Sequence, residues 1–301
     1  MRYSRMENSR HKQPGGPRKA WFFVAFVLVI GVGVYIIGAA KVGNFISEKI
    51  VTPVVAWVTG EDAKNPDPAN PSASAAPSPS PSEAAPSSTA TVTLKGGTIY
   101  ALQAGIFADE ANANALATTL SGQGGAGYVL ADTEGYRVLI AGYQTEGEAE
   151  SVKNQLKSEQ QMETKQYAIT SAETKFRITA DTATIASVQA AMEGAMEYQE
   201  ALLPLSISLD KGETKAEDAK TQIAQLREKA ENMKKTVDEI ASSTDNKTIK
   251  SISQFYGETV TALQGVGEGL GDIELSAKIK YTYLAIGVAG RNLSDALNAA
   301  A

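Results

Sequence analysis

Histidine and cysteine, the side chains that most often build hydrolytic sites, are nearly absent from this sequence of 301 residues. There is no cysteine, and the single histidine, His11, lies in a short basic segment near the first residue. Zinc sites and catalytic triads need such side chains, so neither can form in the long remainder of the chain. We therefore predict no metal site, no cofactor and no enzyme activity.

Carboxylates are the remaining candidates for acid–base chemistry, but their spacing favours a different role. In one long stretch they interleave with lysines, as on the solvated face of a helix. These are Glu213, Glu217, Asp218, Glu228, Glu231, Asp238 and Glu239. The glycine-rich stretch GVGEGLG lacks the preceding strand that a phosphate-binding loop requires. A net charge of -6 does not suit nucleic acid either.

A membrane anchor is predicted before any folded domain. Residues 21–40 contain no charged side chain, and twenty helical residues at 1.5 Å each cross a bilayer core of about 30 Å. The basic tail, residues 1–20, favours a cytoplasmic N-terminus, so we expect a single-pass protein of the cell membrane with its bulk outside. The small residues Gly38 and Ala40 also permit a cleaved signal peptide, although its apolar region normally spans only about 7–15 residues.

Two segments are expected between this anchor and the folded part. Residues 41–60 form a juxtamembrane segment, either an interfacial one with Trp57 at headgroup depth or an ordinary helix. Residues 61–96 are rich in Pro, Ser and Ala. Such a composition cannot bury a core, so we predict a disordered linker that tethers a domain away from the bilayer.

Residues 97–172 are predicted to form an α+β domain. The strand-like run GTIYALQAGIF precedes a helix capped by Asp109, and AGYVLAD and YRVLIAGY form a hairpin. Thr145 and Glu148 then form a capping box before a second helix, and KQYAITSA supplies the last strand. The βαββαβ order predicts a ferredoxin-like, four-stranded antiparallel sheet with both helices on one face and the other face open.

Residues 181–301 are predicted to form an all-α helical bundle of about four helices. Pro204 is expected to end the first helix, and glycines 265–271 separate the last two. The bundle could dock an envelope or cell-division protein, pair with a second copy as a coiled coil, or act as a passive spacer. Between Pro204 and these glycines, apolar residues repeat as a heptad seam: Ala216, Ala219, Ile223, Leu226, Ala230, Met233, Val237 and Ile240.

Two of the predicted strands, with the helices that follow them, resemble the SPOR domain family. IYALQAGIF leads into ADEANANALATTL, and YRVLIAGY leads into TEGEAESVKNQL, with Ala141 as one extra residue in the second strand. The resemblance implies a domain that binds, without cleaving, peptidoglycan glycan strands that have lost their stem peptides, at division septa or during sporulation. The matching residues are Gln103, Gly105, Phe107, Ala111, Tyr136, Arg137, Val138, Gly142 and Tyr143.

We expect five of these residues to contact glycan on the open face of the sheet. Gln103 would exchange hydrogen bonds with hydroxyl or acetamido groups, Phe107, Tyr136 or Tyr143 would stack on sugar rings, and Arg137 would contact the polymer. Arg137 as a solvated charge and Phe107 as a core residue are the alternatives. Strict alternation places Gln103 and Phe107 on one face, but Tyr136 and Arg137 on opposite faces.

Two functions therefore remain open. The first is a membrane-anchored protein that binds peptidoglycan at the septum or in sporulation. The second is a scaffold or regulator whose helices recruit a divisome protein or cell-wall hydrolase, with the sheet domain only localising it.

Overall fold

The computed structural model describes residues 87–267 and 269–300. The predicted tail, membrane span and juxtamembrane segment, together with most of the predicted linker, lie outside these ranges. Within the two ranges, no helix combines the length and the apolar character needed to cross a bilayer.

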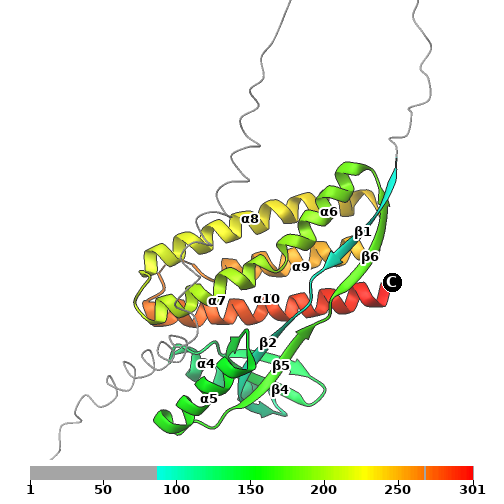
Figure 1. Cartoon of the computed structure of the whole chain (residues 1–301). Coiled ribbons are helices and arrows are strands. Elements are labelled where there is room, and N and C mark those ends of the chain that lie inside the picture. The colour runs from blue at the N-terminus through cyan, green and yellow to red at the C-terminus, as the bar shows by residue number, and fades with distance from the viewer. Residues whose placement is uncertain (1–86, 268, 301) are drawn as a thin grey trace, which may run out of the picture.

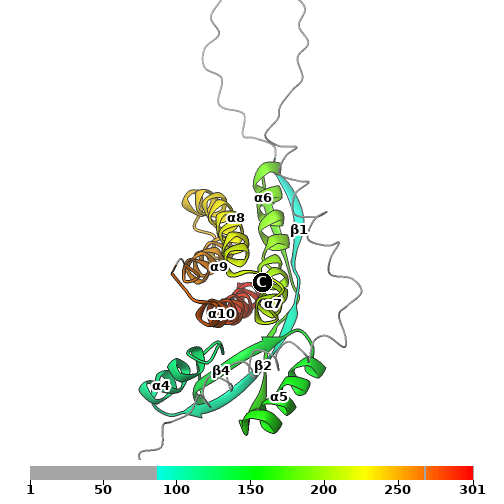
Figure 2. The ribbon, with the colours of Figure 1, turned by 90° about the vertical axis from the view of Figure 1, so that its left-hand side faces the viewer.

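The predicted βαββαβ unit is confirmed. In chain order it consists of β2 (Gly97–Phe107), α4 (Glu110–Ser121), β3 (Tyr128–Asp132), β4 (Gly135–Tyr143), α5 (Glu146–Gln160) and β5 (Lys165–Ser171). The four strands form one sheet in the order β3-β4-β2-β5, and every neighbouring pair is antiparallel. Helices α4 and α5 pack on one face of this sheet (Figure 2).

Both helices begin at the predicted caps. The Asp109 carboxylate accepts a hydrogen bond from the Asn112 amide at 3.1 Å. At the second helix, Thr145 Oγ1 accepts from the Glu148 amide and the Glu148 carboxylate accepts from the Thr145 amide, which completes a capping box. These bonds satisfy amides that would otherwise lack partners at each helix start.

The pairing of β2 with β4 changes register twice, between Leu102 and Gln103 and between Gln103 and Gly105. An extra residue in one strand turns the side chains beyond it to the opposite face of the sheet. The first shift adds a residue to β4, whereas the second adds one to β2, between Gln103 and Gly105. Phe107 therefore packs with the α4 and α5 side, whereas Gln103 lies on the other side with Arg137. The expectation from strict alternation that Gln103 and Phe107 share a face is wrong for this reason.

A two-stranded ribbon extends the sheet strands and was not predicted. It pairs β1 (Ser88–Leu94) with β6 (Thr174–Ala180) in antiparallel register. Strand β1 lies within residues 61–96, so the folded part begins earlier than the predicted end of the linker. Val92 and Leu94 are buried, at 2% and 3% exposure. The ribbon forms because these two side chains find an apolar surface on the helices.

The rest of the described chain is helical, with five helices where about four were expected. They are α6 (Thr182–Gly194), α7 (Glu197–Asp210), α8 (Ala216–Ser243), α9 (Lys247–Gln264) and α10 (Asp272–Ala300) (Figure 1). The expectation that Pro204 ends a helix is wrong, because Pro204 lies inside α7. Its neighbours Leu202 and Leu205 are buried, and such burial offsets the cost of about 3 kcal/mol for an internal proline.

The heptad seam of α8 packs within the chain. Ala219, Ile223, Ala230 and Val237 are buried in the same core as α9, and the remaining seam residues pack against that core. Helix α8 lies along α9 in Figure 1. The apolar surface that could have paired with a second copy is thus already occupied.

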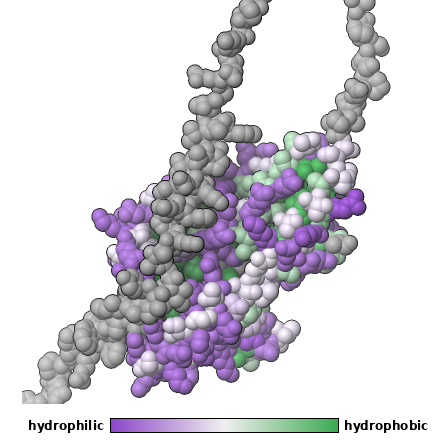
Figure 3. Space-filling model, viewed as in Figure 1, coloured by the Kyte–Doolittle hydropathy of each residue, from purple (hydrophilic) through white to green (hydrophobic). Residues whose placement is uncertain are grey.

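The second face of the sheet is not open as predicted, because α10 crosses part of it (Figure 2). Leu139 and Ile169 from the sheet belong to one continuous core with Tyr283 and Leu284 of α10. Helix α10 can approach the sheet closely because Gly142 of β4 and Gly287 of α10 both leave room for the Ile99 side chain. The sheet and the helices therefore share one apolar interior, and in Figure 3 the outside of the lower part of the molecule is mainly hydrophilic.

Replacing Gly287 with alanine should loosen this contact. A Cβ at that position would lie 2.2 Å from Cδ1 of Ile99, which is itself buried, so we expect a loss of about 1–3 kcal/mol in unfolding free energy. The matched control is Gly147→Ala in α5, where a Cβ meets nothing within 4 Å. Urea unfolding should show the control unchanged or more stable. Equal stabilities for the two variants would contradict close packing of α10 on the sheet.

Candidate functional site

A polar network joins all four strands of the sheet on the face that α10 partly covers. At its centre is Arg137 of β4, whose Nη1 donates to Gln103 Oε1 of β2 at 2.7 Å. The Arg137 Nε donates to the Asp132 carboxylate of β3, and Nη2 donates to Glu134. The guanidinium carbon lies 4.5 Å from the ring centre of Tyr167 of β5. We call Gln103, Asp132, Arg137 and Tyr167 the Arg137 network.

Local pairing explains how these side chains meet. The tight turn between β3 and β4 is held by the Glu134 amide, which donates to Asp132 Oδ1 at 2.8 Å. This turn brings the Asp132 carboxylate back toward Arg137. On the neighbouring strand β5, Tyr167 pairs with Ala101 of β2, two residues before Gln103. A stacked guanidinium over an aromatic ring is favourable because the ring face carries negative potential.

The electrostatics of the network favour binding over catalysis. The hydrogen bond from Arg137 lowers the pKa of Asp132, and the Asp132 carboxylate raises the pKa of Arg137. A general acid in glycoside hydrolysis needs a raised carboxyl pKa, which is the opposite shift. The network thus offers fixed hydrogen-bonding groups on a strand surface, which suits a polar, extended ligand.

Comparison with known families identifies the part of the chain that carries the Arg137 network. The SPOR domain model matches residues 96–168. These residues are a SPOR domain. The match runs from the start of β2 into β5 and contains the whole Arg137 network. The β1–β6 ribbon and the five C-terminal helices lie outside it. Neither a curated protein nor a solved structure matches the chain. A SPOR domain implies peptidoglycan binding.

The structure separates the five residues that were expected to contact glycan. Gln103 and Arg137 come together in the Arg137 network of the SPOR domain. Phe107 and Tyr136 pair across β2 and β4, and both pack partly buried against the α4 and α5 side. Tyr143 is 3% exposed on that same side, so its ring offers no face to a sugar and we leave it out of the proposed site.

Sequence reasoning missed Tyr167 and Asp132 as parts of this SPOR domain site. Asp132 had a signal, because it ends one strand of the predicted hairpin and Arg137 lies near the start of the other. Tyr167 had none, since its place depends on the register between β2 and β5, which are more than 60 residues apart in sequence. Of the matching glycines, Gly105 lies at the bulge between β2 and β4, and Gly142 lies where the sheet approaches α10 closely.

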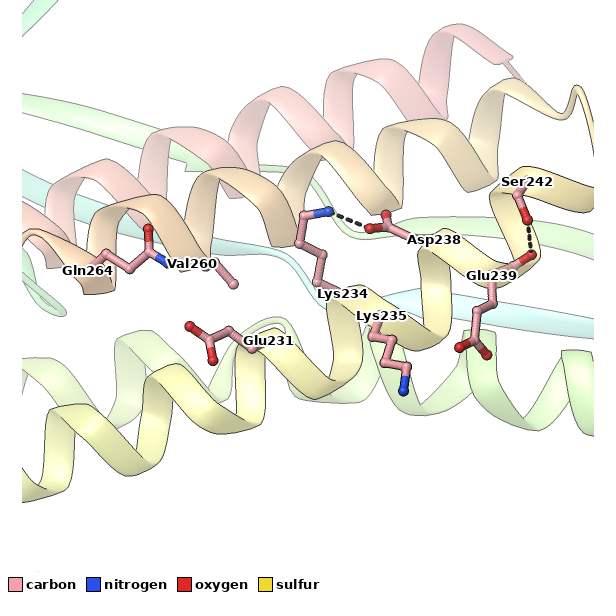
Figure 4. A pocket seen from close by; sticks show the side chains of 8 residues that line it. All are labelled: Glu231, Lys234, Lys235, Asp238, Glu239, Ser242, Val260 and Gln264. Atoms are coloured by element: carbon pink, nitrogen blue, oxygen red, sulfur yellow. Dashed lines mark hydrogen bonds and ion pairs between the residues drawn. The ribbon is translucent and has the colours of Figure 1, made fainter.

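The carboxylates of α8 form no competing site. A shallow pocket of about 560 Å³ between α8 and α9 includes Glu231, Lys234 and Asp238 (Figure 4). Lys234 donates to Asp238, which also accepts from Ser253, and Glu231 forms an ion pair with Arg227. Within the described ranges, no group of three acidic or histidine side chains has the geometry of a metal site.

Proposed function

We propose that this protein is a membrane-anchored, non-enzymatic binder of denuded peptidoglycan glycan strands that acts at the division septum or in sporulation. The observation that supports this function best is the Arg137 network on the sheet of the SPOR domain. The uncharged residues 21–40 and the Pro-rich segment that follows support an anchor with a tether, with the N-terminus in the cytoplasm and the SPOR domain outside.

The network would hold a sugar chain through fixed polar groups. Gln103 is 8% exposed. Arg137 occupies its side-chain amide oxygen, which leaves the amide nitrogen as the hydrogen-bond donor for the ligand. The Asp132 and Glu134 carboxylates accept hydrogen bonds from sugar hydroxyls. Ile106, 40% exposed on the same face, offers an apolar contact beside these groups. Arg137 acts mainly as a positioning residue, because three of its nitrogens already donate within the protein.

Removing Arg137 or the Gln103 amide should weaken glycan binding. We expect Arg137→Ala and Gln103→Ala to lower affinity about 5- to 150-fold, since each loses or misplaces hydrogen bonds that are worth about 1–3 kcal/mol. The test incubates the full chain in detergent with purified sacculi, before and after an amidase removes the stem peptides. Bound protein is measured by sedimentation over a concentration series.

Arg177→Ala is the matched control, because Arg177 is an exposed arginine on β6 outside the SPOR domain. It should bind like the unchanged protein. Enrichment on stripped sacculi is the expected result for the unchanged chain. Equal binding to intact and stripped sacculi, or full binding by the two network variants, would count against this function.

A further inference from the structure

A groove between α9 and α10 ends on the sheet of the SPOR domain. It holds about 870 Å³, which lies within the range of ligand sites of about 300–1,000 Å³. Small residues, including Gly257, Ala262 and Ala285, keep it open between the two helices. Its polar and aromatic lining includes Tyr128, Gln254, Thr261, Lys278, Tyr281 and Asn292.

Strand β3 connects this groove to the Arg137 network. Tyr128, Leu130 and Asp132 alternate along one strand and therefore face the same side. Tyr128 begins the strand at the groove, and Asp132 ends it in the network. At a rise of about 3.4 Å per residue, the two positions are roughly 14 Å apart. Leu130 between them is buried under α10, so an extended ligand would reach both by running along the outer edge of β3, which is an edge strand of the sheet.

The aromatic residues of the groove suit sugar rings. Tyr128 and Tyr281 contact each other edge to face, with ring centres 5.0 Å apart. Tyr281 is 36% exposed, so part of its ring can stack on a sugar. Burial raises the pKa of Tyr128 to about 12, so its hydroxyl is a neutral hydrogen-bond donor at pH 7. Gln254, Thr261 and Asn292 add donors and acceptors for hydroxyl and acetamido groups.

Three charged side chains line the groove, and two of them already have partners within the protein: Lys234 is in an ion pair, and the Glu258 carboxylate accepts a hydrogen bond from Gln254 at 2.8 Å. The third, Lys278, suits a carboxylate on the ligand. Lys278 lies over the Tyr281 ring at 5.3 Å, and no carboxylate of the described residues forms an ion pair with it. Removing the stem peptides from peptidoglycan leaves one lactyl carboxylate on every second sugar. A denuded strand therefore carries regularly spaced negative charges that an exposed, unpaired lysine can attract.

From the groove, its continuity with β3, its aromatic pair and Lys278, we infer that α9 and α10 form a second glycan subsite. This subsite extends the SPOR domain surface and receives the lactyl carboxylate of a strand already held by the Arg137 network. The inference rests on the proposed glycan binding, and it gives the C-terminal helices a direct part in ligand recognition. It also predicts a preference for long strands over short ones.

Binding constants for glycan oligomers of two lengths test the subsite. The full chain in detergent is titrated with amidase-treated oligomers of one and of six disaccharides, followed by fluorescence anisotropy. We expect the long oligomer to bind at least tenfold more tightly. Lys278→Gln and Tyr281→Ala should each lower the long-oligomer affinity about three- to tenfold and leave the short-oligomer affinity within twofold. Tyr281→Phe should retain the affinity lost in Tyr281→Ala.

Two further arms separate the possible failures. Lys250→Gln, an exposed lysine of α9 outside the groove, should change neither affinity. A neutral oligomer of N-acetylglucosamine of matched length should bind more weakly and be insensitive to Lys278→Gln. Long-oligomer affinity that survives both groove variants overturns the subsite, while loss of all binding in the unchanged chain overturns the proposed function itself. Equal loss with the neutral oligomer overturns recognition of the carboxylate.

Discussion

Lys280→Ala is expected to lower the free energy of unfolding by about 3–5 kcal/mol, which is the usual cost of removing one partner from a buried ion pair. Lys280 and Asp210 are each 6% exposed. Lys280 Nζ lies 2.8 Å from Asp210 Oδ2 and donates to Ser276 Oγ and to the Gly124 carbonyl, each at 2.8 Å. Without the ammonium, a buried carboxylate would lose its counter-ion.

This cluster joins three parts of the molecule. Asp210 ends α7, Lys280 and Ser276 lie on α10, and Gly124 belongs to the loop between α4 and β3 of the SPOR domain. Burial lowers the pKa of Lys280, and the Asp210 carboxylate opposes that shift. The ion pair therefore joins the helices to the sheet at a point where both charges are buried.

Urea unfolding of the full chain in detergent measures the effect. Lys278→Ala, two residues away and exposed, is the matched control and should change stability by less than about 0.5 kcal/mol. The double variant Lys280→Met with Asp210→Leu should recover most of the loss, because apolar residues of similar size can replace a buried pair. A Lys280→Ala variant as stable as Lys278→Ala would mean that water reaches the cluster.

Separating the sheet from the helices is expected to have a still larger effect. A fragment of residues 88–180 keeps the SPOR domain and the ribbon but loses α10. Ile99, Leu130, Leu139 and Ile169 are at most 4% exposed in the whole chain and would lose much of their cover. Burying each such side chain is worth about 1.5–3 kcal/mol. The sum is comparable to the total stability of a small domain, about 5–15 kcal/mol.

We therefore expect the fragment to aggregate or to bind a hydrophobic dye such as ANS, without a cooperative unfolding transition. Soluble yield, dye fluorescence and thermal unfolding measure this directly. The control is residues 88–301, which retain the shared core. A fragment that unfolds cooperatively with little dye binding would show that the SPOR domain folds independently here. Such a result would restore the two-module arrangement in which the sheet only localises the helices.

The sequence predicted the local structure of the SPOR domain well because its signals act over short distances. Asp109 and Thr145 cap their helices through residues three positions later, and the hairpin needs only a two-residue turn. Strands β2 and β4 could be recognised from the β-branched and aromatic residues that they contain. The heptad seam of α8 likewise indicated a long helix with one buried face.

The site was predicted less completely, since side-chain direction depends on register. One extra residue in β2, between Gln103 and Gly105, turned Phe107 to the opposite face from Gln103, and this bulge is visible only in the pairing of β2 with β4. Tyr167 joined Arg137 only through the pairing of β5 with β2. A difference of one residue in such pairings exchanges the two faces of a strand.

The sequence by itself determined which segments of the SPOR domain become strands and helices, where its two helices begin, and that histidine and cysteine chemistry is excluded beyond the N-terminal tail. Only the tertiary structure decided that α10 covers part of the sheet face that the sequence left open, and that Gln103 and Arg137 share a network while Tyr143 is buried. The physical reason is distance along the chain. Caps and hydrophobic periods act between near neighbours, whereas Gly287 meets Ile99 through a core assembled from both ends of the folded region.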